Sequence, residues 1–272
     1  MASLQAWALE LLRLTLWLGI LAALFAPLER LFALHRRVGR MKDVPADIAF
    51  YFLNSLIPLV LLAPPLAILG AVARGAMPAA YLAWAAALPL GAKLGLGVVV
   101  SEFGGYWGHR LSHKIPLLWR FHAVHHAPRH VDWLVSSRAH PVDEVFAKLT
   151  ALAPVYVFGL AQPSPQGLGI GAAVAVFGLL WGFLIHANVR WRLGPLEWII
   201  SSPAFHHWHH TKDPGYRDRN FAALLPVFDR LFGTHHLPPH WPEAYGVDEP
   251  QPDTLAEQLV RPFQPARPSL GK

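Results

Sequence analysis

The sequence concentrates its histidines in two short windows, and their spacing favours metal binding. Eleven of the sixteen histidines lie between His109 and His140 or in the segment FHHWHH, which ends at His210. Within these windows three sets have spacings of i, i+4 or i, i+3, i+4, which place each set on one face of a helix. The sets are His109 and His113; His122, His125 and His126; and His206, His209 and His210.

Neutral imidazole is the commonest metal ligand in proteins near pH 7, and three converging sets would supply eight nitrogens. Eight nitrogens exceed the needs of one tetrahedral or octahedral ion, so the sequence predicts two metal ions. Two other interpretations are structural histidines that are solvated or hydrogen-bonded, and an adventitious histidine-rich tract. Neither accounts for the helical spacing shared by sets that lie far apart in the chain.

The composition predicts an integral membrane protein. Hydrophobic residues make up 54% of the 272 residues and charged residues 15%, an apolar excess that a soluble core does not need. The chain has no cysteine, which excludes disulfides, iron–sulfur clusters and thiolate ligands, so a metal must rest on imidazole and oxygen. The net charge of +6 comes from basic residues at the ends of apolar segments, a pattern typical of membrane topology and not of nucleic-acid binding.

Apolar runs predict about four membrane segments in one all-helical domain. Residues 14–28 and 48–73 carry no charge, the second run with three prolines that should kink or shorten it, and residues 77–100 are interrupted only by Lys93. Residues 149–189 contain no Asp, Glu, Lys or Arg, and the turn signal AQPSPQG in their middle predicts a membrane hairpin over 149–185. The last two segments either cross the bilayer or are re-entrant.

Charge placement predicts the orientation in the membrane. A basic cluster follows the first apolar run, whereas a signal peptide has a basic start, so we expect a retained helix whose C-terminal end faces the cytoplasm. Both ends of the hairpin emerge on one side, which places the two histidine windows together on the cytoplasmic face of an inner (plasma) membrane. We therefore expect membrane helices in residues 1–97, the hairpin and a cytoplasmic helical cap with the histidine site in residues 98–240, and a tail in residues 241–272. The basic cluster consists of Arg30, Arg36, Arg37, Arg40 and Lys42.

Several blocks of the sequence, in this order, carry a resemblance to a known family. The blocks are EFGGYWGHRLSH, LWRFHAVHH, RAHPVDE, HANVRWRLGPLEW, FHHWHH and DRNFAALLPVFDRLFGT, which cover roughly residues 98–236. They resemble the fatty acid hydroxylase superfamily, also called the sterol desaturase family. The resemblance implies an integral membrane oxygenase whose histidine-bound di-iron centre activates O₂ and hydroxylates or desaturates a lipid C–H bond.

The resemblance also implies roles for single residues. The three histidine boxes of the family correspond to the three sets above, and a further family histidine corresponds to His186, which we expect to be a ninth ligand. His140 lies in an R-x-H-P block with Arg138 and Asp143, and for His140 both a ligand role and a supporting role remain open. Asp143 stands where the family usually has glutamate and Glu144 follows it, so either carboxylate could serve.

Many metal-bound rings need hydrogen-bonding partners that fix their orientation. The residues expected to support the ligands in this way are Glu102, Arg138, Asp143, Asn188, Asp218 and Asp229. For each of them a surface salt bridge is an equally good interpretation. His207, inside the third box, is expected to be a neighbour of the ligands.

The metal and the reaction leave alternatives open. Imidazole binds zinc, copper, iron and nickel alike, so the ligands alone do not select iron, and zinc is an expected occupant of an isolated or crystallised form. A site at the mouth of apolar helices favours an oxygenase, because a lipid chain can enter while bulk water is excluded. No flavin, nicotinamide or haem block is visible, so we expect a separate electron-donor protein. The rivals are a zinc-dependent membrane hydrolase and a non-enzymatic metal-binding or transport protein, and the substrate is open among sterol, fatty acyl, alkylglycerol and isoprenoid lipids.

Overall fold

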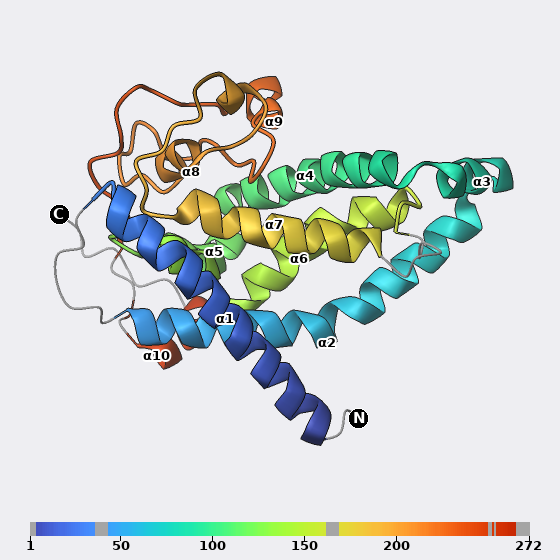
Figure 1. The fold of residues 1–272 in the computed structure, drawn as a ribbon, viewed down its shortest axis with the longest axis horizontal. Helices are drawn as coiled ribbons and strands as arrows, with labels where there is room; N and C mark the ends of the chain where they lie inside the picture. Colours follow the sequence, from blue (N-terminus) through green and yellow to red (C-terminus); the bar gives the residue numbers. More distant parts are fainter. Residues whose placement is uncertain (1–3, 36–42, 162–168, 250–251, 253, 265–272) are drawn as a thin grey trace.

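The computed structural model describes residues 4–35, 43–161, 169–249, 252 and 254–264, and the regular elements of this part of the chain are all helical (Figure 1). The only β pairings among these residues are isolated bridges between Ala33 and Val189 and between Thr211 and Tyr245. The all-α expectation is therefore confirmed. The helices are α1 (Leu4–Phe32), α2 (Val44–Ala76), α3 (Ala79–Ala87), α4 (Leu90–Lys114), α5 (Pro116–His126), η1 (Trp133–Ser137), α6 (Pro141–Val157), α7 (Ile170–His186), η2 (Gly194–Trp198), α8 (Pro203–His209), α9 (Val227–Leu231), α10 (Leu255–Val260) and η3 (Arg261–Phe263).

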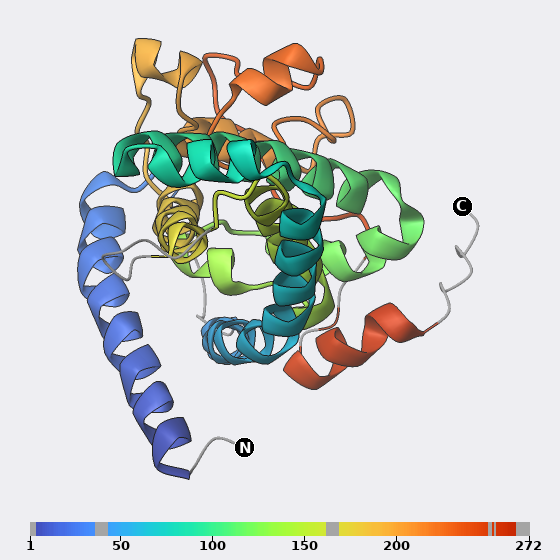
Figure 2. The same cartoon turned by 90° about the vertical axis from the view of Figure 1, so that its right-hand side faces the viewer.

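Helices α1 and α2 are long and apolar enough to cross a membrane. They have 29 and 33 residues, which at about 1.5 Å per residue exceeds the roughly 30 Å of a hydrocarbon core. Helix α2 continues through three internal prolines and bends along its length (Figures 1 and 2). Each proline removes a backbone hydrogen bond and crowds the preceding turn, which accounts for the bend. The prolines are Pro58, Pro64 and Pro65.

The third apolar run is not one straight helix, because it is divided into α3 and α4 with a bend of 112° between them. Pro89 causes the break, since proline disfavours helical conformation in the residue before it, and Leu88 is extended (φ −57°, ψ 137°). Lys93 Nζ donates a 2.8 Å hydrogen bond to the Ala86 carbonyl oxygen and so satisfies one of the free carbonyls at the end of α3. The described residues therefore contain two candidate spans, or three if the bent pair counts as one, where four segments were expected.

The two arms of the predicted hairpin are α6 and α7. Each has 17 residues, a length of about 25 Å, which falls short of a hydrocarbon core of roughly 30 Å. These lengths suit a re-entrant pair better than two full crossings. The turn of the hairpin at 162–167 and the basic residues Arg36, Arg37, Arg40 and Lys42 lie outside the described residues.

Helices α4 and α6 approach each other closely at two glycines. A methyl group on Gly104 would lie 2.1 Å from the carbonyl oxygen of Thr150, and one on Gly108 would lie 2.1 Å from Thr150 Oγ1. A Cβ atom cannot be accommodated at such distances, so the contact requires glycine. Small residues spaced four apart let membrane helices pack backbone to backbone. The contact holds the end of α4, which bears His109, against α6, which bears Asp143.

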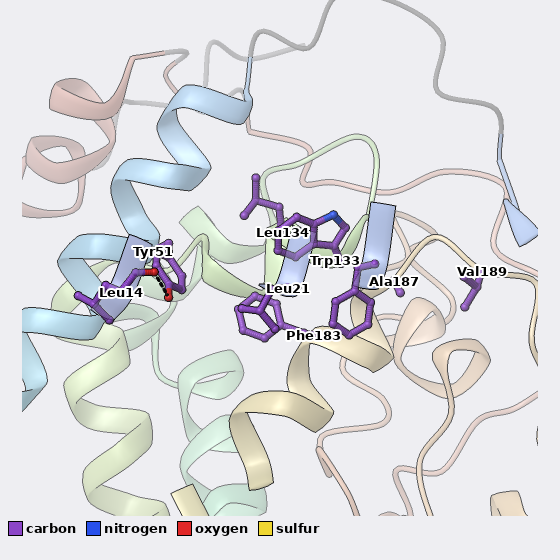
Figure 3. Close-up of a cluster of buried hydrophobic side chains, with 9 residues drawn as sticks. Leu14, Leu21, Tyr51, Trp133, Leu134, Phe183, Ala187 and Val189 are labelled. Atoms are coloured by element: carbon purple, nitrogen blue, oxygen red, sulfur yellow. Dashed lines mark hydrogen bonds between the residues drawn. The ribbon is translucent and has the colours of Figure 1, made fainter. Parts of the chain in front are cut away.

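A buried apolar cluster joins α1 and α2 to the segments that follow α5 and α7 (Figure 3). The Tyr51 hydroxyl donates to the Leu14 carbonyl oxygen at 3.0 Å and ties α2 to α1. Near the other end of α1, a carboxylate oxygen of Glu29 accepts hydrogen bonds from the backbone N–H groups of Trp133 (2.8 Å) and Asn188 (2.9 Å). Helix α1 thus fixes both segments beside the histidine site. The cluster consists of Leu14, Leu21, Phe25, Tyr51, Trp133, Leu134, Phe183, Ala187 and Val189.

Residues 187–249 form a cap of short helices and loops beside α4 and α7 (Figures 1 and 2). The cap is organised by the buried carboxylate of Asp229, which accepts hydrogen bonds from the backbone N–H groups of Phe221 and Ala222, each at 2.8 Å. The Phe221 ring packs edge-on against Tyr106 of α4, with ring centroids 6.0 Å apart. These contacts lock the cap loop onto the helix that carries the first histidines.

Candidate metal centre

The histidines of the three boxes and His186 converge from four helices. Two lie in the last turns of α4, three in α5 and two in α8, with His210 directly after α8, while His186 is the last residue of α7. Helix α8 starts at this point because Ser202 caps it, its hydroxyl accepting from the Phe205 N–H at 3.2 Å, and because Pro203 fits the first turn.

The rings form two groups, in each of which one ligand nitrogen per ring lies within 4.8 Å of all the others. The grouping confirms that the three sets meet, as their spacing predicted, and it adds His186, which only the resemblance indicated. The two groups touch, since the rings of His126 and His210 stack with centroids 4.5 Å apart. The five-histidine group is His109, His113, His122, His126 and His209, and the four-histidine group is His125, His186, His206 and His210.

In the four-histidine group the Nε2 atoms face one another. His186 Nε2 lies 2.9 Å from that of His206 and 3.2 Å from those of His125 and His210. His186 Nδ1 lies 2.7 Å from the Gly182 carbonyl oxygen, which only accepts, so Nδ1 carries the proton and Nε2 presents a lone pair. Converging lone pairs at these distances repel each other unless a cation lies between them.

The five-histidine group has the same arrangement. His122 Nε2 lies 3.1 Å from that of His109 and 3.2 Å from that of His126. On the outer side, His109 Nδ1 donates to the Phe221 carbonyl oxygen at 2.7 Å and His122 Nδ1 donates to Asp143 Oδ2 at 2.9 Å. Protons on the outer nitrogens leave the inner nitrogens free to bind metal.

The remaining two rings of this group present nitrogens that lack a partner. His113 Nδ1 lies 3.1 Å from Asp218 Oδ1, and His209 Nδ1 donates to the Arg219 carbonyl oxygen at 2.8 Å. Their Nε2 atoms are buried and have no hydrogen-bond partner among the described residues. A buried polar atom without a partner is costly, and a metal ion at this point would satisfy both nitrogens.

The spacing of the nitrogens fits metal coordination. A metal–nitrogen bond of about 2.1 Å places neighbouring ligand nitrogens about 3.0 Å apart at a right angle and about 3.4 Å apart in a tetrahedron. The closest contacts within the groups are 2.9–3.2 Å. The two groups therefore fit two ions, the number expected from the sequence.

Burial keeps these rings in the neutral form that binds metal. The pKa of His125 is lowered to about 4, first because burial disfavours the charged ring and second because His122 lies nearby. Burial likewise lowers the pKa values of His126 and His210 well below the ordinary range, and neighbouring histidines add to the effect. These rings need not lose a proton before they bind a metal at neutral pH.

Of the two adjacent carboxylates in the R-x-H-P block, only Asp143 reaches a histidine of the site. Asp143 holds His122, while Glu144 forms a 2.8 Å ion pair with Lys148. Asp218 also lies at its expected place, next to His113.

Arg138 supports the site through its backbone and not through its charge. Its carbonyl oxygen accepts a 2.9 Å hydrogen bond from His125 Nδ1. Its guanidinium forms a buried ion pair with Asp47 of α2 and lies 3.6 Å from Asp43 Oδ1. The role of Asp47 was not predicted, although a carboxylate at the start of a long apolar helix is a signal that could have found it.

His140 lies in neither group. Its Nδ1 accepts from the Val142 N–H at 3.1 Å and caps α6, and its Nε2 donates to the Leu259 carbonyl oxygen at 3.1 Å. Its ring packs against Phe121 and against Phe263 of the tail, with centroids 4.9 and 5.6 Å away. Both ring nitrogens are occupied by backbone, so the ligand role that was left open for His140 is not supported.

Three residues expected to orient the rings bond elsewhere. Glu102 accepts from the Leu224 N–H at 2.8 Å, and Asn188 exchanges hydrogen bonds with the His35 backbone at 2.7 and 3.0 Å. Asp229 holds the cap loop described above. All three fix loops around the site and do not hold the rings themselves.

His207 lies beside the ligands, as expected. It is fully buried, with Nε2 3.1 Å from the Ala187 carbonyl oxygen and Nδ1 2.8 Å from the Tyr245 hydroxyl. Sequence reasoning missed the backbone carbonyls that hold the outer nitrogens. These carbonyls belong to Arg138, Gly182, Arg219 and Phe221. Gly182 lies one turn before His186 on α7, and the positions of the other three carbonyls depend on how the loops fold.

A pocket of about 350 Å³ borders the five-histidine group. The Trp119 ring stands beside the rings of His113 and His126, with centroids 5.1 and 5.6 Å away. The pocket walls also contain Arg217, Asp218, Asp248 and Glu249.

These features define a class of protein. It is a helical protein with candidate membrane spans, in which apolar helices end at a buried histidine site that can hold two metal ions.

Comparison with known proteins identifies the family. Residues 94–234, just over half of the chain, match the fatty acid hydroxylase family, and the chain belongs to it. Its relatives are named for hydroxylation, monooxygenation and desaturation. The resemblance found in the sequence is confirmed.

Three relatives show the breadth of the family. The ornithine lipid hydroxylase OlsE of Rhizobium tropici is 37% identical over 66% of this chain and 53% of its own length. The alkylglycerol monooxygenase of Danio rerio is 34% identical over 55% of this chain and 31% of its own, and a Delta(7)-sterol 5(6)-desaturase of Gibberella zeae is 26% identical over 54% and 38%. The chain spans about half or less of the length of these relatives. No solved structure matches it.

Proposed function

We propose that this protein is an oxidoreductase, a membrane-bound di-iron oxygenase that hydroxylates or desaturates a lipid C–H bond, with O₂ as oxidant and a separate protein as electron donor. The proposal is carried by one observation, the two histidine groups whose Nε2 atoms converge while the Nδ1 atoms of His109, His122 and His186 are held from outside. Membership of the family supports the reaction class.

The histidines of the five-histidine group would hold one iron and those of the four-histidine group the other. Iron bound there would activate O₂ and supply the oxidant for the C–H bond. The chain itself fixes the rings, through Asp143 on His122 and through backbone carbonyls on other rings. Burial of the rings keeps bulk water from the reacting atoms.

The substrate we propose is an amphipathic membrane lipid with a polar headgroup. Two relatives are named for such lipids, an ornithine lipid and an alkylglycerol. The pocket beside the five-histidine group combines an aromatic wall, Trp119, with charged groups such as Arg217 and Glu249, which suits a molecule with both characters.

The proposed setting is an inner membrane, with the histidine site on the cytoplasmic side and about four membrane segments. The candidate spans and the basic residues that follow α1 in the sequence support this orientation. Residues 1–97 would anchor the chain, residues 98–240 would form the catalytic region, and residues 241–272 a tail.

Metal analysis combined with isotope-labelled O₂ tests the proposal. The full chain, expressed in cells and purified with its metal, should contain two irons. Cells that contain the chain should accumulate either a lipid with one labelled oxygen atom or a lipid that has lost two hydrogens. Stoichiometric zinc together with an O₂-independent hydrolysis product would instead support the zinc hydrolase.

A further inference from the structure

The cap carries five large apolar side chains on its outer surface, which we call the apolar rim. Their exposed fractions range from 42% to 69%. A water-facing surface normally carries charged groups at such positions, and a contiguous apolar patch marks a contact with another phase or molecule. The rim consists of Leu196 and Trp198 of η2, Ile199 directly after it, and Val227 and Leu231 of α9.

At η2 the usual arrangement of polar and apolar side chains is reversed. Glu197 is only 7% exposed, and its carboxylate accepts from the Ser202 hydroxyl at 2.7 Å and from the Leu193 N–H at 3.2 Å. Its neighbours Leu196 and Trp198 point outward, 58% and 69% exposed. A turn that buries its only carboxylate and exposes its hydrocarbon is stable where the surrounding medium is apolar.

Helix α9 shows the same reversal. Val227 and Leu231, one turn apart, are exposed on one face, while Phe228 and Asp229 are buried on the other. A short helix between water and a core carries polar residues outward, whereas α9 turns apolar side chains outward, as expected where the medium outside is apolar.

The rim is a fixed surface joined to α4. The Arg230 guanidinium lies 4.2 Å from the centre of the Trp198 ring and donates to the Glu197 carbonyl oxygen at 3.0 Å, which ties α9 to η2. Phe228 packs against Phe103 of α4 with ring centroids 5.8 Å apart.

The rim also continues onto an exposed apolar face of α4 itself. Phe103 is 44% exposed, and Leu96 and Val99, two turns and one turn earlier, are 40% and 46% exposed. This part of α4 belongs to the bent pair that counts as a candidate membrane span. The apolar rim is thus continuous with a candidate lipid-facing surface.

We propose that the apolar rim inserts into the boundary between headgroups and acyl chains of the same bilayer that holds the apolar helices. A tryptophan beside an arginine suits this boundary, where an apolar body and a polar tip are both satisfied. None of the rim residues belongs to the walls of the charged pocket.

The docking would set the depth of the histidine site. With Phe103 at the boundary, His109 lies six residues further along α4, about 9 Å on the aqueous side. The inference concerns only the membrane contact and requires neither bound metal nor catalysis.

The chain has no cysteine, so single cysteines can report the depth of the rim. Full-length Trp198→Cys and Leu231→Cys variants would carry a nitroxide label in vesicles of phosphatidylcholine and phosphatidylglycerol, with Glu243→Cys, an exposed site elsewhere on the cap, as the matched control. Relaxation by O₂ and by a water-soluble nickel chelate measures the depth of each label. We expect the two rim labels about 5–10 Å below the headgroups and the control label in water.

Two outcomes would overturn the inference. If the nickel chelate reaches the rim labels as readily as the control, the rim faces water. If neither O₂ nor nickel reaches them, a protein surface covers the rim. A third variant, Ile199→Cys, replaces either rim variant that fails to fold by far-UV circular dichroism. The depth measurement needs no turnover. If the chain is inactive or iron-free but its rim labels are buried, the oxygenase proposal is refuted and the membrane contact of the rim is still supported.

Discussion

Replacing Gly108 by alanine tests whether the close contact between α4 and α6 sets the geometry of the metal site. The new Cβ would lie 2.1 Å from Thr150 Oγ1 and 2.7 Å from Thr150 Cβ. Rotation of the Thr150 side chain moves Oγ1 but leaves Cβ in place. The two helices must therefore separate by about 0.7 Å to reach an ordinary contact of 3.4 Å.

The separation would act on the site directly, because His109 follows Gly108 and Asp143 lies on the opposing helix. Overpacking of this kind costs about 1–3 kcal/mol of stability. A displacement approaching 1 Å of groups that must align can cost up to about 10²-fold in rate. We therefore expect Gly108→Ala to unfold at a lower temperature and to lose about one to two orders of magnitude of activity.

The assay compares the full-length variant with Gly105→Ala in the same detergent or vesicles. A Cβ on Gly105 would meet only Ala151 Cβ, at 3.7 Å, an ordinary contact, so this control should keep the stability, iron content and activity of the parent. The reasoning is refuted if Gly108→Ala matches Gly105→Ala in unfolding temperature and in iron bound per chain.

Three further predictions follow from the contacts around the site. Asp143→Asn removes the charge that holds His122 Nδ1, so metal affinity of the five-histidine group should fall about 10–100-fold in a competition titration, and unchanged affinity would contradict this role. The His125 pKa of about 4 in the fold, against about 6.5 unfolded, means that the unfolded chain binds more protons. The metal-free protein should therefore lose stability in denaturant titrations as the pH falls from about 6.5 to about 4 and show no such loss above about pH 7. Asp47→Asn leaves the buried Arg138 guanidinium without its buried carboxylate and should cost roughly 3–5 kcal/mol in the same titrations, whereas wild-type stability would show that the ion pair contributes little.

The convergence of the histidines could be predicted because helical spacing alone puts each box on one face, and three such boxes in one chain are typical of a shared metal site. His186 could not be found in this way, since it stands alone at the end of an apolar helix, and only its sequence context indicated it. Asp143 and Asp218 could be proposed as acceptors, but Glu102 and Asn188 were equally plausible. Only the tertiary fold decides which of these side chains reaches a ring.

The membrane part was predicted less well. The hydropathy of the sequence predicts the apolar runs. It does not predict that the third run bends by 112° at Pro89, or that α6 and α7 are only 17 residues long. The reversed polarity of η2 and α9 is also invisible in sequence, because the exposed fractions of Glu197 and Leu231 follow from tertiary contacts.

Anomalous X-ray scattering at the iron edge, from crystals of the full chain purified with its metal, tests most directly whether the histidines hold two irons. We expect two peaks, one among the Nε2 atoms of the five-histidine group and one among those of the four-histidine group. A single peak, or metal bound away from these nitrogens, would contradict the di-iron centre.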